Sequence, residues 1–398
     1  MTENVVVLGS GYAGAGAVKS IERTLEDEVD LTWISDVDHH FVLHESHRII
    51  RDPRVKEKIT IPVDEIKSPA TRFIQAAVTG MNANDREVEL DDGTTVSYDY
   101  AVLAIGSQTA FFGIDGLEEH ALTLKDLDDA LEIHEAVKSA ARDASRSDPA
   151  QVVVGGAGLS GIQSAGETAE FRDKHRAPID IHLVEGLENV FPPGDPEIQE
   201  LLDEKLRERD INIMTGEFIG EVDEDTVYVG DDTELDYDVL LWTGGITGQD
   251  LTQDLEIGKD ERSFRLHASS TFETDAPDVF AIGDTALVDQ DDDEPAPPTA
   301  QAAWDAAEVV GENVRRAIND QPLKEWRYRD KGTLVSVGQE AVAHDIKPVE
   351  GVDLPIAALL GSDTFDGVAA ETLKKAVAAR WINRITGPSR AAKAWPDM

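Results

Sequence analysis

Two short glycine-rich runs hold the residues whose spacing indicates chemistry. Each has three glycines at the spacing G-x-G-x-x-G: Gly9, Gly11 and Gly14 in the first run, and Gly156, Gly158 and Gly161 in the second. At this spacing the first glycine permits a tight turn, the second leaves space for a pyrophosphate, and the third lets the following helix pack closely on a strand. One such run is a weak signal, but two in matching contexts predict two dinucleotide sites.

An acidic residue follows each run at the distance expected of a ribose ligand. Asp36 comes 22 residues after Gly14, and Glu185 comes 24 residues after Gly161. A carboxylate at this place accepts hydrogen bonds from ribose hydroxyls. Because 80 of the 398 residues are Asp or Glu, neither acid would be convincing without its glycine run.

The elements that must position these residues recur in the same order. In each half an apolar strand precedes the glycines, a helix follows them, and a second strand ends near the acid. The predicted segments are 4–8, 15–25 and 29–34 in the first half, and 152–154, 162–172 and 180–184 in the second. Later in each half a further apolar strand, 98–105 or 237–242, ends in glycine. Such continuous apolar strands are typical of parallel sheets covered on both faces.

The stretch from Asp275 to Asp305 is expected to return the chain to the first half. Residues 279–282 are predicted to form a buried strand that ends in Gly283 and Asp284, and residues 300–310 a helix. We therefore predict an α/β fold with two doubly wound, Rossmann-like domains. The expected boundaries are 1–114 and 253–325 for a discontinuous first domain, 115–252 for the second, and 326–398 for a C-terminal interface segment.

The charge balance limits the classes of function. The formal net charge is -44 and is spread along the whole chain. Such a charge repels itself in dilute buffer, whereas at molar salt the Debye length is only about 3 Å. This favours adaptation to a highly saline cytoplasm, with an ordinary acidic cytosolic protein as the alternative. Nucleic acid is not an expected partner, because it requires a basic surface.

Two absences are also informative. The chain has no cysteine, which excludes structural disulfides, thiolate metal sites and redox-active thiols. The first strand begins almost at Met1, which leaves no room for a signal peptide, and no apolar run approaches the roughly 20 residues that span a bilayer. We therefore expect a soluble or peripheral protein on the cytoplasmic side.

The order of these motifs resembles the two-dinucleotide-domain flavoprotein reductases, the pyridine nucleotide-disulfide oxidoreductase type. Three local matches, P-P-T-A-Q at 297–301, L-W-T-G-G at 241–245 and the aromatic-rich run at 326–337, are similar to type II NADH:quinone oxidoreductases. The resemblance implies bound FAD, hydride transfer from NADH to the flavin, and two electrons passed on to quinone in a respiratory chain. With no thiol available, direct transfer through the cofactor is the expected route.

The resemblance also implies which residues bind. For FAD they are Gly9, Gly11, Tyr12, Ala13, Gly14, Asp36, Val78, Ala104, Ile105, Gly106, Gly283, Asp284 and Gln301. For the nicotinamide cofactor they are Gly156, Gly158, Leu159, Ser160, Gly161, Glu185, Gly244 and Gly245. For quinone they are Gln301, Trp304 and Asp305. Glu185 favours NADH over NADPH, because a carboxylate binds a 2′-hydroxyl and repels a 2′-phosphate.

Two positions depart from the family pattern. The family usually has Glu two residues after the last glycine of the second run, where this chain has Gln163. Glu167, one helical turn later, faces the same way and either substitutes as the catalytic acid or only contacts neighbouring elements. The family's second glutamine after P-P-T-A-Q falls at Asp305, so an amide has become a carboxylate in the expected quinone site.

One group of neighbouring histidines raises the question of a metal site. His39, His40, His44 and His47 lie close together in sequence, but nothing else offers ligands, so no metal site is predicted.

Two alternatives stay open for the function. One is a soluble NADH-dependent reductase of a ferredoxin- or rubredoxin-like carrier, and the other is a non-catalytic, flavin-binding regulatory protein.

The C-terminal segment combines apolar residues at helical spacing with basic ones. Residues 365–398 hold six Lys and Arg against three Asp and Glu. A basic amphipathic helix on an acidic protein indicates an interfacial helix on an anionic membrane, at the inner face of the cell membrane. With charge screened by salt, contact would depend on Phe365, Leu373, Trp381 and Ile385. The alternative is a helix packed on its own protein or on a partner in a homodimer.

Overall fold

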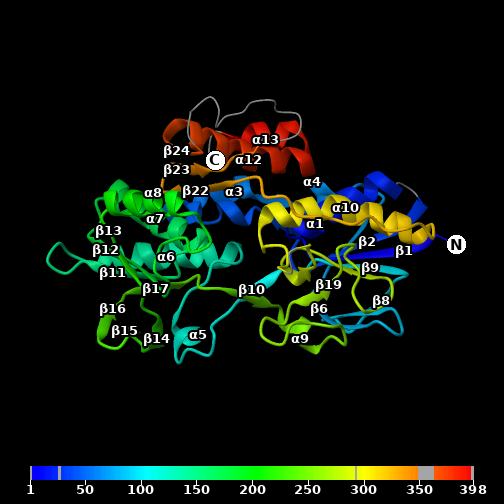
Figure 1. Ribbon diagram of the computed structural model, residues 1–398, viewed down its shortest axis with the longest axis horizontal. Helices are drawn as coiled ribbons and strands as arrows, with labels where there is room; N and C mark the ends of the chain where they lie inside the picture. The colour runs from blue at the N-terminus through cyan, green and yellow to red at the C-terminus, as the bar shows by residue number, and fades with distance from the viewer. Residues whose placement is uncertain (1, 26–27, 292–293, 348–362, 396–398) are drawn as a thin grey trace.

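The structure is a computed structural model that describes residues 2–25, 28–291, 294–347 and 363–395. Two α/β halves lie side by side, and a C-terminal layer lies across one face of both (Figure 1). The predicted fold class, two doubly wound dinucleotide-binding halves with a C-terminal segment, is confirmed.

The first half is built on a five-stranded parallel sheet with the order β20-β9-β1-β2-β5. Its strands are β1 (Glu3–Leu8), β2 (Val29–Ser35), β5 (Arg72–Gln75), β9 (Tyr100–Leu103) and β20 (Val279–Ala281). Residues 5–8 of β1 are at most 1% exposed, which explains why that run is apolar without alternation. The late strand β20 pairs in parallel with β9, so the chain does return to its first sheet after the second half, as predicted.

Two helices pack together on the first sheet. They are α1 (Tyr12–Leu25), which follows the first glycine run, and α10 (Ala300–Ile318). Small residues allow their close approach, because a Cβ on Gly16 would lie 2.6 Å from that of Ala307. The predicted helices, 15–25 and 300–310, both lie within the observed ones. Helix α1 begins earlier than predicted, and α10 ends later.

The second half is built on a four-stranded parallel sheet with the order β13-β12-β11-β17. Its strands are β11 (Ala150–Gly155), β12 (Ile179–Glu185), β13 (Ile211–Thr215) and β17 (Val239–Trp242). The helices α6 (Leu127–Asp143), α7 (Leu159–His175) and α8 (Pro196–Glu208) accompany it. Helix α6 begins at Leu127, because the Asp126 side chain accepts a hydrogen bond from the Asp129 amide and caps the helix there.

Each half carries an antiparallel sheet of three strands after its third parallel strand. In the first half these are β6 (Val78–Asn82), β7 (Glu87–Leu90) and β8 (Thr95–Ser97). In the second half they are β14 (Ile219–Val222), β15 (Thr226–Val229) and β16 (Thr233–Asp236). The two neighbouring strands β5 and β6 therefore belong to different sheets.

The two halves are joined by a pair of crossing segments. Strand β10 (Ser107–Thr109) leads out of the first half and pairs antiparallel with β18 (Ile246–Gly248), which leads back. Further short elements follow on the return: α9 (Asp250–Asp254), β19 (Leu266–Ala268), η4 (Gly283–Thr285) and β21 (Ala286–Val288). The crossing point lies close to the predicted domain boundaries at 114 and 252.

Short elements between β2 and β5 were not predicted. They are β3 (His39–Phe41), η2 (Leu43–Glu45), α2 (Arg48–Arg51), η3 (Pro53–Val55), α3 (Lys56–Ile59), β4 (Thr60–Pro62) and α4 (Val63–Ile66). None is long enough to show a helical or strand period in the sequence. This region supplies several residues of the site described below.

The C-terminal layer consists of a small sheet and two helices. Its elements are β22 (Thr333–Val337), β23 (Glu340–His344), β24 (Thr364–Asp366), α12 (Gly367–Thr386) and α13 (Pro388–Ala394). A partly exposed ion-pair group attaches this layer to the second half, because Lys205 of α8 contacts three carboxylates. These belong to Glu208 at 3.3 Å, Glu340 at 3.0 Å and Asp366 at 3.0 Å.

Helix α12 packs on its own protein along one face. Trp381 and Ile385 are only 1% and 2% exposed, so neither side chain is available to a membrane, contrary to the expectation for these two. Phe365 is partly buried in the small sheet. In the described part of the chain no helix combines the length and apolar character needed to cross a bilayer.

Candidate active site

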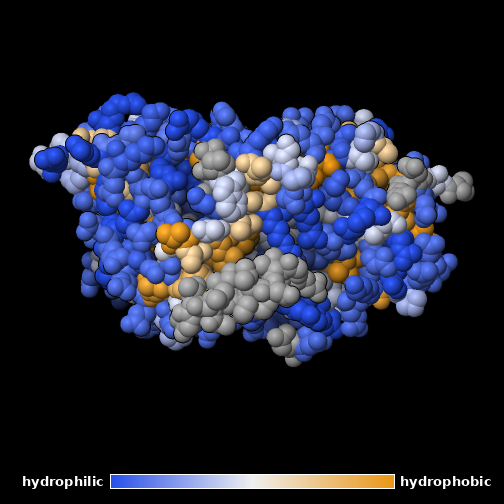
Figure 2. Space-filling model, turned by 90° about the horizontal axis from the view of Figure 1, so that it is seen from above, coloured by the Kyte–Doolittle hydropathy of each residue, from blue (hydrophilic) through white to orange (hydrophobic). Residues whose placement is uncertain are grey.

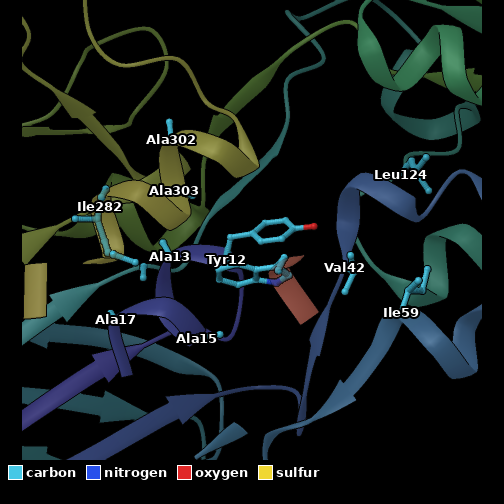
Figure 3. Packing of buried hydrophobic residues seen from close by; sticks show 14 of the residues in the cluster. Tyr12, Ala13, Ala15, Ala17, Val42, Ile59, Leu124, Ile282, Ala302 and Ala303 are labelled. Carbon is cyan, nitrogen blue, oxygen red and sulfur yellow. The ribbon is translucent and has the colours of Figure 1, made fainter. Parts of the chain in front are cut away.

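A cavity of about 860 Å³ lies at the junction of the two halves and the C-terminal layer. Segments far apart in sequence line it: the first glycine run, the end of β9, the start of α7, the start of α10 and the inner face of α12. Figure 3 shows the hydrophobic packing next to this cavity, with Tyr12 between Ala302 and Ala303 of α10 on one side and Val42 and Leu124 on the other. Any ligand here would therefore contact both halves.

The first glycine run has the geometry that a pyrophosphate requires. Gly9 has φ +100°, and a Cβ there would collide with the carbonyl of Ala104. A Cβ on Gly14 would collide with the carbonyl of Gly9, whereas one on Gly11 would meet nothing within 4 Å and would occupy the cavity. Two glycines thus close the turn, and the third leaves space for a ligand, as the spacing predicted.

The second run repeats this arrangement. Gly156 has φ +92°, a Cβ on Gly161 would collide with Gly156, and one on Gly158 would meet nothing within 4 Å. The Glu185 carboxylate accepts hydrogen bonds from the amides of Ala157 at 2.8 Å and Leu187 at 3.0 Å. The acid is therefore fixed at the end of β12, beside the glycine turn.

Most residues predicted to bind FAD are brought together at the cavity. Those that line it are Gly9, Gly11, Tyr12, Ala13, Asp36, Val78, Ala104, Ile105, Gly106, Asp284 and Gln301. Gly14 lies beneath the turn, and Gly283 packs on the Cβ of Ala13. A dinucleotide fits this site, because the open glycine, the acid and a long cavity follow one another in the order of pyrophosphate, ribose and base.

The residues predicted for NADH divide into two groups. Leu159 and Ser160, at the start of α7, line the same cavity as the FAD residues. Gly156, Gly158, Gly161, Glu185, Gly244 and Gly245 lie outside it. The start of α7 therefore joins the second nucleotide groove to the first.

Lys125 is a site residue that the sequence did not indicate. It lines the cavity and donates to Ser107 Oγ at 3.1 Å, and Ser107 Oγ lies 3.3 Å from an oxygen of Asp284. Burial lowers the Lys125 pKa, while the carboxylates of Asp284 and Asp129 oppose this effect. No pattern around residue 125 distinguishes it from a surface lysine.

A buried polar cluster forms part of the cavity wall and joins four distant segments of the chain. Lys374 of α12 donates to Ser336 Oγ of β22 at 2.6 Å and lies 3.4 Å from His47 Nε2. With its amide oxygen facing these donors, Gln163 of α7 accepts from Ser336 Oγ at 3.2 Å and from Lys374. All four side chains are at most 8% exposed. Sequence analysis identified only Gln163 among them.

Two carboxylates lie behind this cluster. Glu167 is fully buried and has Arg51 Nε at 3.3 Å, and Glu45 is 1% exposed and has Arg48 Nε at 3.2 Å. Glu167 does not line the cavity but is one helical turn further from it than Gln163. Burial raises the pKa of Glu167, and the cations of Arg51 and Arg48 oppose this effect.

The titration of Lys374 is shifted towards the physiological range. Burial lowers its pKa to about 8, the Glu45 carboxylate opposes the shift, and the Arg48 cation adds to it. His47 is held neutral, because burial and then the charge of Lys374 lower its pKa well below the ordinary value. Lys374 is thus the residue in this cluster that can exchange a proton near neutral pH.

An aromatic group forms another part of the cavity wall. The rings of Trp304 and Trp381 stack with centroids 5.2 Å apart, and Tyr12 lies 5.2 Å from Trp381. Trp381 Nε1 donates to His40 Nε2 at 2.8 Å, so His40 Nδ1 carries the hydrogen that it donates to the carbonyl of Ser10 at 2.8 Å. Burial agrees with this neutral state, since it lowers the His40 pKa to about 4.

The residues predicted for quinone line the cavity, and two of them also bind a neighbouring segment of the chain. Gln301 Nε2 donates to the carbonyl of Arg329 at 3.1 Å, and Asp305 forms an ion pair with Lys331. Trp304 also lines the cavity and belongs to the aromatic group. Among the described residues, no group of three or more His, Asp or Glu is placed to hold a metal ion.

Two glycine-turn halves that share one cavity define a two-dinucleotide oxidoreductase. The family model described as pyridine nucleotide-disulphide oxidoreductase matches residues 3–307, and the chain belongs to this family.

Individual relatives are similar over nearly their whole length. The chain is 27% identical to a type II NADH:quinone oxidoreductase of Staphylococcus haemolyticus, with 98% of each protein covered. Among solved structures, NDH2 from Plasmodium falciparum in complex with NADH has a TM-score of 0.82 at 18% identity, covering 100% of this chain and 98% of that one. The sulfide:quinone oxidoreductase of Aquifex aeolicus has a TM-score of 0.78 at 18% identity, covering 97% and 92%. Both structures share the fold.

Proposed function

We propose that this chain is an FAD-dependent NADH:quinone oxidoreductase that does not pump protons. The observation that carries the proposal is the shared cavity, which adjoins both glycine turns and has the buried lysine cluster in its wall. The similarity to the staphylococcal enzymes supports the same function. The absence of cysteine separates the chain from reductases that use a thiol relay.

FAD, when bound, supplies the chemistry of accepting a hydride and releasing two electrons. The protein then has to bind, orient and supply protons. The first glycine run and Asp36 are suited to the ADP part of FAD, and the second run with Glu185 to that of NADH. Leu159 and Ser160 mark where the two grooves meet.

The reaction requires one proton beyond the hydride, because NADH, a proton and quinone give NAD⁺ and quinol. Lys374 is the group we assign to deliver it. Its ammonium is held by Ser336 at 2.6 Å beside Gln163, and its pKa of about 8 keeps it protonated at neutral pH. Gln163 carries no proton to exchange, so it positions Lys374, and Glu167 lies behind as a counter-charge.

Quinone is proposed to enter the cavity beside the aromatic group, between the start of α10 and the inner face of α12. Trp304 offers a flat apolar surface for a quinone ring. Gln301 and Asp305 keep the neighbouring segment 329–331 in place, Gln301 through its hydrogen bond to the Arg329 carbonyl and Asp305 through its ion pair with Lys331. Leu373 and Val377 of α12 complete the apolar lining.

We also propose that the protein lies peripherally on the inner face of the cell membrane, in a cytoplasm of high salt. Hydrophobic side chains gather near the middle of the face that carries α12 and α13, with hydrophilic ones around them (Figure 2). Val368 of α12 is 78% exposed and Trp395 is 40% exposed. These, and not Trp381 or Ile385, would contact lipid.

An anaerobic visible spectrum in molar salt tests the function. NADH is expected to bleach the flavin band, and a soluble short-chain quinone is expected to restore it rapidly. A band bleached by NADH but left reduced by quinone would instead favour a reductase of a small iron-sulfur carrier. A band unchanged by NADH would exclude both enzymes and leave a flavin-binding regulatory protein.

A further inference from the structure

A second cavity, of about 400 Å³, lies where α2, α6 and α7 meet, and no residue of either glycine run lines it. Its charge is opposite in sign to that of the chain. The nine lining residues include four cations, Arg51, Arg54, Lys138 and Lys174, and one carboxylate, Asp52. The whole chain has 36 Lys and Arg against 80 Asp and Glu. Positive charge concentrated in a concave surface attracts anions.

Ion pairs within the protein account for part of this charge. Arg54 donates to both carboxylate oxygens of Asp52, at 2.9 and 2.5 Å, and Lys138 pairs with Glu135 one turn earlier on α6 at 2.7 Å. Lys174 lies in the last turn of α7, where a cation complements the helix dipole. The Lys138 and Lys174 side chains are 41% and 47% exposed, and each ammonium has three donors. Both therefore keep donors for a ligand.

Arg51 is the residue that most directly indicates a ligand. Its side chain is only 15% exposed, and its Nε lies 3.3 Å from Glu167. Its Nη1 is buried and has no hydrogen-bond acceptor in the part of the chain that the structure describes. Buried donors in folded proteins are almost always paired. The fixed fork of a guanidinium can bind a carboxylate with one side and a phosphate with another.

The remaining lining is rigid and partly apolar. Phe171 is 4% exposed, and its ring lies 4.5 Å from that of His175. His134 is 6% exposed and donates from Nδ1 to the carbonyl of Ile50 at 2.9 Å, which fixes its ring against α2. A cavity that combines cations with buried rings suits a small molecule that carries a phosphate.

We propose that this cavity binds a small phosphate-bearing anion, and that Arg51 transmits its binding to the lysine cluster. The short helix α2 connects the two places. Arg51, at its end, contacts Glu167 behind the cluster, and His47, just before its start, lies 3.4 Å from the Lys374 ammonium. A phosphate beside Arg51 competes with Glu167 for the guanidinium.

This competition has a direction. The Glu167 carboxylate raises the pKa of Lys374. When Arg51 is shared with a phosphate, the Glu167 charge is less compensated, and Lys374 becomes a weaker acid. We therefore expect the bound anion to slow proton delivery, and with it the reoxidation of the flavin by quinone. This second part rests on the proposed function, whereas the binding site does not.

Calorimetry of the FAD-loaded protein in molar potassium chloride measures the binding. Saturating NAD⁺ is present, so that phosphate does not enter the second glycine run. The probes are inorganic phosphate and phenyl phosphate, and one bound molecule per chain is expected. Tighter binding of phenyl phosphate would identify a phosphate ester as the ligand, and tighter binding of inorganic phosphate would identify the free ion.

Three variants locate the site. Arg51→Lys should weaken phosphate binding at least about tenfold, because lysine keeps a cation beside Glu167 but has no planar fork. The double variant Lys138→Gln, Lys174→Gln should weaken it about 2- to 30-fold, the range for two exposed ion pairs, and leaves the contact with Glu167 intact. Arg142→Gln removes a cation one turn further along α6, outside the cavity, and should leave the affinity within about twofold.

The site would be overturned if neither probe bound saturably, or if Arg142→Gln weakened binding as much as the double variant. In stopped-flow measurements, saturating phosphate should slow flavin reoxidation by quinone at least about twofold, and should slow it less in the double variant. An unchanged rate would overturn the transmission through Arg51. If the protein bound phosphate here but did not oxidise NADH, the site would stand and the proposed function would fail.

Discussion

Replacing Lys374 by methionine removes the proposed proton donor while preserving the length of the side chain. The ammonium of Lys374 is 7% exposed, lines the cavity and has a pKa of about 8. About nine-tenths of the molecules are then protonated at pH 7, and about one in eleven at pH 9. Quinone reduction by the unchanged protein should therefore be nearly constant below pH 8 and fall about tenfold per pH unit above it.

In Lys374→Met the alkaline decrease should disappear. The rate of quinone reduction at pH 7 should drop by roughly 10²- to 10⁴-fold, the usual contribution of a positioned acid. Reduction of the flavin by NADH should be unaffected, because hydride transfer requires no proton from the protein.

Stopped-flow absorbance can measure the two half-reactions separately between pH 6 and pH 10. Lys375→Met is a matched control, since the neighbouring lysine does not line the cavity. The reasoning would be refuted if Lys374→Met kept the same pH profile, or if it slowed reduction by NADH as much as reoxidation by quinone.

Further substitutions and a change of pH test the glycine turn, the lysine cluster and the ion pairs of Lys205. Gly14→Ala should yield protein without flavin absorbance, because its Cβ would collide with the Gly9 carbonyl; a normal flavin content on purification would contradict this. Gln163→Glu should move the alkaline decrease above pH 8, since a carboxylate beside Lys374 raises the lysine pKa, and an unmoved profile would argue against their contact. The free energy of unfolding should rise by up to roughly 3 kcal/mol from pH 8 to pH 10.5, because the unfolded state binds the Lys374 proton more tightly than the folded state; urea titrations should show this increment missing in Lys374→Met. Lys205→Met should lower the free energy of unfolding by about 1 kcal/mol, because it removes partly exposed ion pairs and leaves three carboxylates close together, and molar salt should reduce this loss if the cause is their repulsion.

The repeated parts of the fold were readable from local pattern. Each repeat lies within a short stretch that holds an apolar strand, a glycine run and an acid, Asp36 or Glu185. Such a stretch indicates one local structure, a strand, a tight turn and a helix. The return of residues 279–282 to the first sheet was also predictable, because the strand ends in a glycine and an acid like a nucleotide-binding edge.

The lysine cluster could not be predicted in this way. His47, Gln163, Ser336 and Lys374 come from four separate segments, and only Gln163 stands in a motif, the second glycine run, that marks its position. Helical spacing correctly indicated α12, but spacing gives only the apolar face and not what covers it. The face with Trp381 is covered by the flavin-side half, and this decided against lipid contact for that residue.

The interrupted first sheet has a consequence for synthesis on the ribosome. Strand β9 ends at Leu103, and its partner β20 begins at Val279, 176 residues later. At a translation rate of roughly 5–20 residues per second, one edge of β9 remains unpaired for about 10–35 s until its partner is synthesised. The second sheet is complete by Trp242, within that interval. The nascent chain thus holds a finished NADH half beside an open strand edge, and that edge is where a chaperone would be needed and where premature termination would leave an aggregation-prone fragment.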